Sequence, residues 1–377
     1  MGMDAAAAAP PKKHPLYFVN APVDFAIIGG ISVLFYLVLA GIIKVGSEDL
    51  SNQLHNRQRW AWELAAVLVW VVNWPHFSAT NYRLYHSPQN IAQYPFTSFA
   101  IPVILLAATV ASFAFPDAVA PFFVKLFLIW SPYHFSGQSV GISLIYARRA
   151  GFAVGRAERL ALSGFIFGTY ILMTARSEAG LGDNSYYDVR VPVLGIPTWF
   201  PDVVEKGMYA CGVALALLVA RWCVVNRRLL PPIVLLPAVT QFIWFIPGAS
   251  IATFNEFVPM FHSLQYLLIA WSMQLKEKMD ENGIAPSSAF VIGESGRWFV
   301  INVAGGAILF YVLPQLAAWG GMPIQFATPV ILSAVQIHHF FVDGVIWKLK
   351  NPKVSSPLLV NIGDLLTPSP QPARAPA

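Results

Sequence analysis

The chain has 377 residues, of which 56% are hydrophobic and only 11% are Asp, Glu, Lys or Arg. Soluble domains carry about 25% charged residues, so this composition excludes an ordinary soluble protein and is typical of a multi-pass membrane protein. The formal net charge of +5 comes without an aromatic and basic motif, so the sequence predicts no nucleic-acid partner.

Hydropathy along the chain predicts about ten membrane-spanning helices, since one span needs about 20 mostly apolar residues. In chain order the predicted spans are 22–44, 60–82, 96–115, 120–146, 157–176, 203–222, 229–248, 253–275, 297–318 and 327–348. We therefore expect an all-α fold, a polytopic transmembrane helix bundle that forms a single domain over residues 21–350. An N-terminal tail (1–20) precedes it, and a Pro/Ala-rich C-terminal tail (351–377), largely disordered, follows it.

The positions of Lys and Arg predict the orientation of the spans. With the N-terminus in the cytoplasm, most basic residues fall in cytoplasmic segments, whereas the opposite loops at 116–119, 249–252 and 319–326 contain none. This is a positive-inside pattern, and it places both termini in the cytoplasm. The even-numbered spans then all run in the same direction, from outside to inside.

Five histidines lie inside even-numbered spans. The second span holds His76, the fourth His134, the eighth His262, and the tenth His338 and His339. Counted from the outer ends, they lie about 9 to 16 residues deep, which is a slab of roughly 10 Å. The sequence therefore predicts that these side chains share one level within the membrane.

Several intramembrane histidines at one level favour a metal site. A single histidine in a span is often only an interhelical hydrogen-bonding residue, but ionisable groups in a membrane are costly and usually functional. Neutral imidazole binds Fe, Cu and Zn. We expect His134, His262, His338, His339 and His76 as candidate ligands. His338 and His339 differ by about 100° around their helix, which favours only one of them as a ligand, and His76 is the weakest member because it is expected nearer the cytoplasmic surface.

Polar residues follow three of these histidines at helical spacing. Gln138 comes four residues after His134, Tyr266 after His262, and Asp343 after His339. Residues at i and i+4 share a helix face, so these three can hold the second ring nitrogen of a ligand or bond another helix. We predict them as catalytic residues, with Asp343 as partner of a ligand, as a ligand itself or as a proton acceptor. A plain ion pair with a cytoplasmic cation is the alternative for this carboxylate.

Two glycines in the fourth span, Gly137 and Gly141, form a GxxxG pattern, which indicates close helix packing more often than chemistry. The sequence contains no phosphate-binding glycine loop, no HExxH and no GxSxG motif. The paired-histidine boxes of membrane desaturases and alkane hydroxylases are missing as well. Any site must therefore be assembled by packing of separate helices.

The segments around the histidines, PHFSATNYRLY, YHFSGQSVGI, FHSLQYL and HHFFVDGVIWK, resemble those of a broad group of bacterial multi-pass membrane proteins. That resemblance covers most of the chain, implies the bacterial inner membrane, and implies no particular activity. More distantly, the distribution of histidines over several spans resembles that of the membrane carotene-cleaving, retinal-forming oxygenases, which hold a non-haem iron with histidines from several spans. This second resemblance implies His134, His262, His338 or His339, and His76 as iron ligands.

The leading hypothesis is a membrane oxidoreductase with non-haem iron, or with Cu or Zn in its place, that acts with O2 on a lipid-soluble substrate. A haem b protein that passes electrons is a second hypothesis, with two histidines as axial ligands. A proton-coupled transporter is a third, with Asp343 in the relay, and an accessory subunit of a membrane complex is a fourth. Membrane lipids are expected partners in each case, and the sequence does not indicate an oligomeric state.

Overall fold

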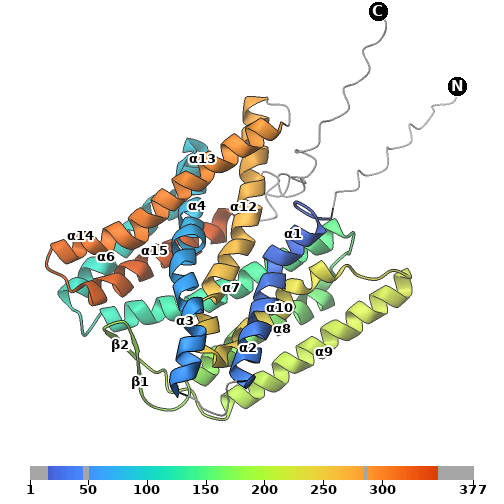
Figure 1. Cartoon of the computed structure of the whole chain (residues 1–377), viewed down its shortest axis with the longest axis horizontal. Coiled ribbons are helices and arrows are strands. Elements are labelled where there is room, and N and C mark those ends of the chain that lie inside the picture. The colour runs from blue at the N-terminus through green and yellow to red at the C-terminus, as the bar shows by residue number, and fades with distance from the viewer. Residues whose placement is uncertain (1–15, 46–50, 284–286, 347–377) are drawn as a thin grey trace, which may run out of the picture.

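The computed structural model describes residues 16–45, 51–283 and 287–346, and this part of the chain is mostly helical. Figure 1 shows the helices packed in one bundle, with a small antiparallel hairpin at one end. The predicted all-α bundle is confirmed. The predicted C-terminal tail, 351–377, lies outside the described residues, as do residues 1–15 of the predicted N-terminal tail.

The elements follow one another with short connections. The first half contains α1 (Ala21–Phe25), the π-helical turn η1 (Ala26–Gly30), α2 (Ile31–Val45), α3 (Ser51–Leu68), the π turn η2 (Val69–Asn73), α4 (Trp74–Tyr85), α5 (Pro88–Gln93), the π turn η3 (Phe96–Ala100), α6 (Ile101–Ala114), α7 (Ala120–Arg149) and α8 (Arg156–Ser177). The hairpin strands are β1 (Asp183–Tyr186) and β2 (Val189–Pro192). The second half contains α9 (Phe200–Asn226), the 3-10 turn η4 (Pro232–Val234), α10 (Leu236–Phe245), the 3-10 turn η5 (Gly248–Ser250), α11 (Ala252–Asn255), α12 (Val258–Asn282), α13 (Ser288–Ala307), the π turn η6 (Ile308–Val312), α14 (Leu313–Trp319) and α15 (Ile324–Ile346).

Helical structure occurs within every predicted span. Within the described part of the chain, six continuous stretches are both long and apolar enough to cross a membrane: Ala21–Ile42, Phe96–Ala114, Arg156–Ser177, Phe200–Asn226, Ser288–Trp319 and Ile324–Ile346. The seventh predicted span differs most, because its α-helix α10 has only 10 residues. The total of ten spans and the cytoplasmic location of both termini stay predictions.

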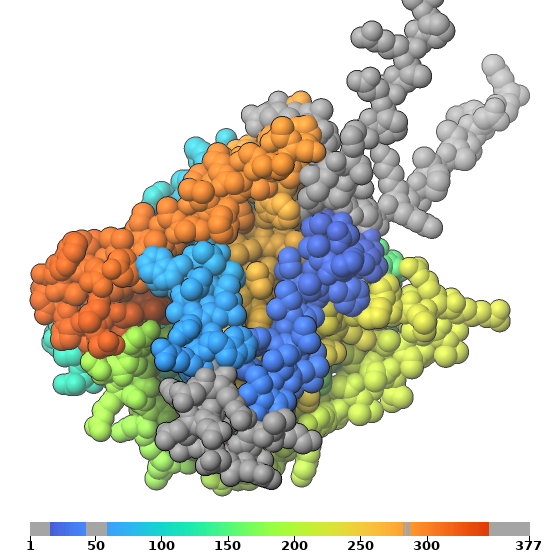
Figure 2. All heavy atoms as spheres, in the orientation of Figure 1, coloured from blue at the N-terminus to red at the C-terminus, as the bar shows by residue number. Residues whose placement is uncertain are grey.

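The outer surface of the bundle is apolar, as expected for a protein in lipid. Leu106, Leu217 and Val300, on three different helices, have exposed fractions of 64%, 65% and 65%. Figure 2 shows one face of the molecule, on which α12 is visible between the α1–α2 segment and the α3–α4 segment. Large exposed apolar side chains on several helices would be unfavourable in water and are favourable against hydrocarbon.

Three π turns have a common cause in the sequence. The turns η2, η3 and η6 each end two residues before a proline, namely Pro75, Pro102 and Pro314. Proline has no backbone N–H for the carbonyl four residues earlier, and a wider turn lets that carbonyl reach the next donor. The turn η2 ends three residues before His76.

Contacts between α4 and α12 show that the two helices run in the same direction. Near the start of both helices Ser263 Oγ lies 3.0 Å from Asn73 Oδ1. Further along both, Arg83 and Glu277 form an ion pair with an N–O distance of 2.6 Å. Because the residue numbers rise together, the helices are parallel.

The residue numbers of contacting pairs also rise together between α7 and α15 and between α4 and α15. The contacting pairs are Trp130–Phe340 and His134–Asp343 in the first case, and Phe77–His339 and Thr80–Asp343 in the second. The four histidine-bearing helices therefore run in the same general direction, with α7 and α15 crossing α4 and α12 obliquely (Figure 1), which agrees with the predicted common direction. This brings side chains at equal depth on separate helices to the same point of the bundle.

The hairpin and the segment before it are fixed to α7 by a buried ion pair. Lys125, on α7, pairs with Glu178, and both side chains are 7% exposed. The second carboxylate oxygen of Glu178 accepts a hydrogen bond of 2.9 Å from the backbone N–H of Leu194. A buried ion pair whose remaining acceptor is also satisfied holds this end of the bundle in one arrangement.

Candidate metal centre

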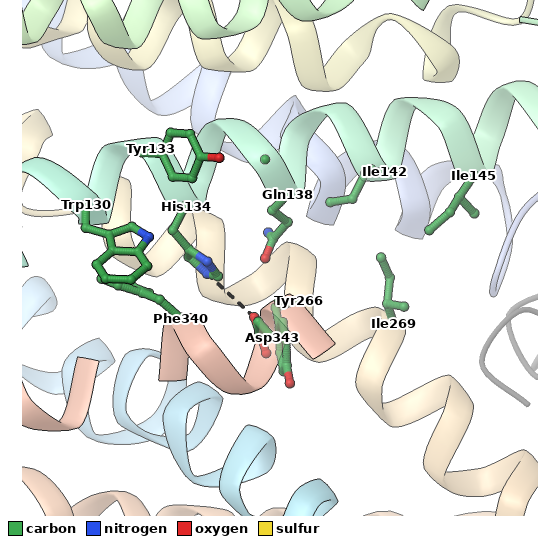
Figure 3. Close-up of a pocket in the computed structure, with 13 residues that line it drawn as sticks. Trp130, Tyr133, His134, Gln138, Ile142, Ile145, Tyr266, Ile269, Phe340 and Asp343 are labelled. Carbon is green, nitrogen blue, oxygen red and sulfur yellow. Dashed lines mark ion pairs between the residues drawn. The ribbon is translucent and has the colours of Figure 1, made fainter. Parts of the chain in front are cut away.

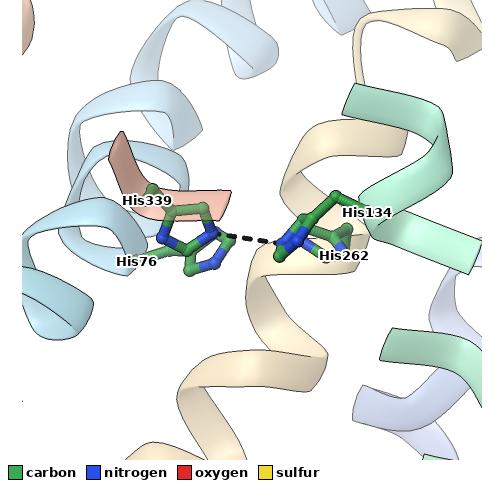
Figure 4. A group of neighbouring side chains, drawn as sticks. All are labelled: His76, His134, His262 and His339. Atoms are coloured by element: carbon green, nitrogen blue, oxygen red, sulfur yellow. Dashed lines mark hydrogen bonds between the residues drawn. The ribbon is translucent and has the colours of Figure 1, made fainter. Parts of the chain in front are cut away.

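Four histidines from four helices meet in the interior of the bundle. They are His76 on α4, His134 on α7, His262 on α12 and His339 on α15, and one ligand nitrogen from each lies within 4.8 Å of the others. Figure 4 shows the four side chains pointing toward one another. The described part of the chain therefore contains a group of four imidazoles that can hold one metal ion.

The four rings form a closed arrangement in which each contacts two others. Ring centroids lie 4.4 Å apart for His76 and His339, 4.8 Å for His339 and His134, 5.1 Å for His134 and His262, and 5.0 Å for His262 and His76. His76, His262 and His339 are at most 2% exposed. The group is therefore almost closed to solvent.

The spacing of the ring nitrogens suits coordination. Metal–imidazole bonds are about 2.0–2.1 Å long, so two nitrogens on one ion are at most about 4.2 Å apart. His134 Nε2 and His339 Nε2 are 3.2 Å apart and already meet this limit. The two ligand nitrogens that lie farthest apart, at up to 4.8 Å, would have to approach each other by about half an ångström to bind the same ion.

Several ring nitrogens of the group have no hydrogen-bond partner among the described residues. They are His76 Nε2, His339 Nδ1, and both Nδ1 and Nε2 of His262. An unpaired buried polar atom costs about 1–3 kcal/mol, so native interiors rarely keep several together without a purpose. A neutral imidazole has one lone pair, so a bound metal ion would take up one nitrogen of each ring, among them His76 Nε2 and one nitrogen of His262. Four neutral imidazoles as donors suit Fe, Cu or Zn.

A chain of side chains orients His76. Its Nδ1 lies 2.9 Å from Ser263 Oγ, which lies 3.0 Å from Asn73 Oδ1 and 2.7 Å from the carbonyl oxygen of Pro259. When the serine donates to either acceptor, its oxygen accepts the Nδ1–H of His76. Nε2 then keeps its lone pair for a metal, the arrangement that ligating histidines usually show. No pattern in the sequence marks Ser263 as a partner of His76, although it directly follows His262.

Asp343 lies beside two of the histidines. Its Oδ2 is 3.4 Å from His339 Nε2 and 3.6 Å from His134 Nε2, and those two nitrogens are 3.2 Å apart. Neighbouring ligand atoms of a tetrahedral site with bonds of about 2.1 Å are about 3.4 Å apart. The carboxylate is therefore placed either to bind the same ion or to accept a proton from what the ion binds.

Tyr266 and Thr80 extend the polar contacts of Asp343. Thr80 Oγ1 lies 3.2 Å from Asp343 Oδ1 and 2.5 Å from Tyr266 Oη. The Tyr266 ring packs against His76, with centroids 4.3 Å apart. The predicted residue Tyr266 thus contacts the group directly at His76, and Thr80 is an additional polar neighbour that no pattern in the sequence marks.

Gln138 lies close to the histidines but does not orient His134. Its Nε2 donates to the backbone carbonyl of His262 at 3.0 Å and to Gln265 Oε1 at 3.2 Å. Gln265 in turn donates to the carbonyl oxygen of Ile28 at 2.5 Å. These bonds join α7, α12 and the first helical segment, so Gln138 fixes the position of two ligand-bearing helices.

An apolar cavity of about 270 Å³ adjoins the histidine group, and His134 and Asp343 form part of its wall. Figure 3 shows these two side chains with Gln138 and Tyr266 at the cavity, with aromatic residues to one side and isoleucines to the other. The remaining wall consists of Trp130, Tyr133, Gly137, Gly141, Ile142, Ile145, Ile269, Phe340 and Gly344.

Glycines keep this cavity open. A Cβ atom added at Gly137, Gly141 or Gly344 would meet no heavy atom within 4 Å. The GxxxG pattern on α7 was expected to indicate close helix packing, and the structure shows instead that both glycines face empty space. Along α7 the wall runs from Trp130 to Ile145, which at about 1.5 Å per residue makes the cavity about 22 Å long.

His338 lies outside the group, although it directly precedes His339. Its Nε2 is 3.1 Å from Tyr85 Oη, on the other side of α15. The expectation that only one of the two adjacent histidines reaches the site agrees with this placement. His76, expected as the weakest member, is instead fully inside the group.

Comparison with known proteins gave no matching family model, no matching curated protein and no matching solved structure. The four histidines, the carboxylate and the cavity are therefore interpreted from their own chemistry.

Proposed function

We propose that this membrane protein is a metalloenzyme in which His76, His134, His262 and His339 hold one iron ion, and that it uses O2 to oxidise a long lipid-soluble molecule. The observation that carries the proposal is the meeting of four buried imidazoles beside an elongated apolar cavity. Copper or zinc would suit the same donors. Zinc is disfavoured because an O2 reaction needs a redox-active metal, and iron is put before copper by the resemblance to the iron-dependent carotene-cleaving oxygenases. As part of this proposal, we place the protein in the bacterial inner membrane.

The protein residues have two roles: the four imidazoles hold the ion, and a second set of side chains transfers protons. A bound iron ion would bind and activate O2 and so supply the oxidation chemistry. The imidazoles hold the ion as neutral ligands, which avoids the cost of placing charged side chains in the membrane. Asp343, at the border between group and cavity, accepts or returns a proton, and Thr80 and Tyr266 extend its hydrogen-bonded chain.

The cavity favours a linear substrate. It is about 270 Å³ in volume and has polar groups at one place only, next to His134 and Asp343. On either side of that place the wall is apolar, so an extended hydrocarbon chain would pass the site with one bond near the metal. The resemblance to carotene-cleaving oxygenases makes a polyene the first substrate to test. A C40 polyene is larger than the cavity, so only the part of its chain near the metal would lie inside it. Cleavage of one double bond by one O2 gives two carbonyl groups and needs no further reductant.

A haem b group suits this arrangement less well. Two axial histidines would have to lie on opposite faces of a porphyrin ring, which needs open space between them. Here each imidazole contacts two others at centroid distances of 4.4–5.1 Å. The rings fill the volume that the macrocycle would occupy.

The proposal is tested with purified full-length protein loaded with Fe(II) in detergent. We expect O2 consumption on addition of β-carotene, with loss of its visible absorption, and none with the saturated chain squalane. Metal-free protein and the His262→Ala variant should be inactive, and the optical spectrum should show no Soret band. Equal O2 consumption with and without iron, or a Soret band in the protein as isolated, would contradict the proposal.

A further inference from the structure

A second and larger cavity, of about 930 Å³, lies on the far side of α4 and α15 from the histidine group. The two helices separate the two spaces. On α15, His339 faces the group and His338 faces the cavity. On α4, His76 faces the group and Ser78 faces the cavity. The remaining walls come from α6 and from the α13–α14 segment, and the volume is in the upper part of the range for small-molecule pockets.

The cavity is elongated along the helices. On the α13–α14 side its wall runs from Ile301 to Leu313, which at about 1.5 Å per residue corresponds to about 18 Å. This segment runs antiparallel to α4, because Arg297 contacts Tyr82 whereas Phe310 contacts Trp74. Leu313 therefore lies at the opposite end of the cavity from Tyr82.

One end of the cavity is polar and uncharged. Tyr85 Oη lies 3.0 Å from the carbonyl oxygen of Ser98 and 3.1 Å from His338 Nε2, and the Tyr85 and His338 rings stack with an interplanar angle of 13°. The other polar residues at this end are Asn81, Tyr82 and His86. Among the described residues that line the cavity there is no Asp, Glu, Lys or Arg.

The other end is apolar and the side wall faces lipid. Leu309, Leu313 and Ile331 line the apolar end. Leu106 and Ile308 also line the cavity and have exposed fractions of 64% and 52% on the outer surface. A molecule dissolved in the bilayer can therefore enter sideways. Tyr85 is hydrogen-bonded to the Ser98 carbonyl and to His338, and its oxygen can still accept a hydrogen bond from a ligand hydroxyl.

We propose that this cavity binds a single-chain lipid with an uncharged hydroxyl head, an alcohol. The hydroxyl of the head donates to the Tyr85 oxygen, and the chain lies along Leu309 and Leu313. The absence of charged lining residues in the described chain disfavours a phosphate or carboxylate head, and the single elongated space favours one chain over two. This site is separate from the histidine group and does not depend on a bound metal.

The test uses full-length, metal-free protein in detergent and two photoreactive probes, a diazirine-labelled hexadecanol and the matching hexadecane. We expect the alcohol to label peptides that contain Tyr85, Leu309 and Ile331, and unlabelled hexadecanol to compete. The Leu309→Trp variant fills the cavity and should reduce this labelling at least fivefold. The control Val300→Trp, on the lipid-facing surface outside the cavity, should leave it unchanged.

A second variant tests the head without filling the cavity. Tyr85→Phe removes one hydroxyl group and should weaken labelling by the alcohol about fivefold, the effect of one hydrogen bond, while labelling by the alkane stays the same. Equal labelling by both probes in wild type and in all three variants would overturn the proposal, because bulk lipid on an apolar surface behaves in that way. Since no metal is present, this outcome is distinguishable from failure of the iron site.

Discussion

His76 Nδ1 lies 2.9 Å from Ser263 Oγ, and this contact fixes which nitrogen of His76 faces the other three histidines. Loss of a partner that orients a ligand typically lowers metal affinity 10–100-fold. We therefore expect Ser263→Ala to bind iron about 10–100-fold more weakly, as measured by competition with a chelator, with little change in thermal stability. Ser250→Ala, which removes an exposed serine hydroxyl, is the matched control. Equal affinity of the two variants would contradict the orienting role.

Asp343 offers a test of proton transfer separate from metal binding. Asp343→Asn keeps the shape of the side chain and removes its charge. Because four imidazoles remain, we expect iron content to stay near that of wild type, and turnover to fall about 10²–10⁴-fold, the usual contribution of a positioned acid or base. Iron content and O2 consumption should be measured on the same preparation. Full turnover in Asp343→Asn would remove this carboxylate from the mechanism.

The empty space beside Gly141 predicts that substrate access can be blocked at a distance from the metal. Gly141→Leu places a side chain in the cavity and should lower turnover of a long polyene at least about tenfold, with iron content unchanged. Gly207→Leu is the control, since a Cβ at this exposed helical glycine also meets nothing within 4 Å. If both variants turn over the polyene like wild type, the substrate does not use this cavity.

The buried pair of Lys125 and Glu178 predicts a large effect on stability. Glu178→Gln leaves a buried ammonium group without its carboxylate and should cost about 3–5 kcal/mol in the free energy of unfolding. Glu205→Gln breaks the partly exposed pair with Arg176, with side chains 47% and 33% exposed, and should cost about 0–1 kcal/mol. Denaturant unfolding in detergent measures both. Similar losses in the two variants would show that burial of the first pair is not important.

The sequence was sufficient for the helical fold and for the common direction of the histidine-bearing helices, because hydropathy and basic residues report directly on spans and orientation. It also identified all four members of the group, since each is a histidine within an apolar helix. Helix geometry further showed that His338 and His339 point in different directions. Which of the two faces the group depends on the rotation of α15 against its neighbours, and no local pattern gives that rotation.

The parts that sequence reasoning missed depend on contacts between distant segments. Ser263 supports His76 across the α4–α12 interface, and Thr80 joins Asp343 to Tyr266 from a third helix. Gln138, expected beside His134, bonds the backbone of His262 instead. A spacing of four residues reports on one helix only, whereas these partners are selected by how helices pack.

The most direct test of the central claim is the metal content of purified protein after reconstitution with Fe(II), compared between variants at the adjacent positions 338 and 339 and at position 262. Wild type and His338→Ala should retain about one iron ion per chain. His339→Ala and His262→Ala should retain less than about a tenth of that amount, since each loses a ligand. Equal iron content in all four proteins, or none in wild type, would contradict a metal site built from His76, His134, His262 and His339.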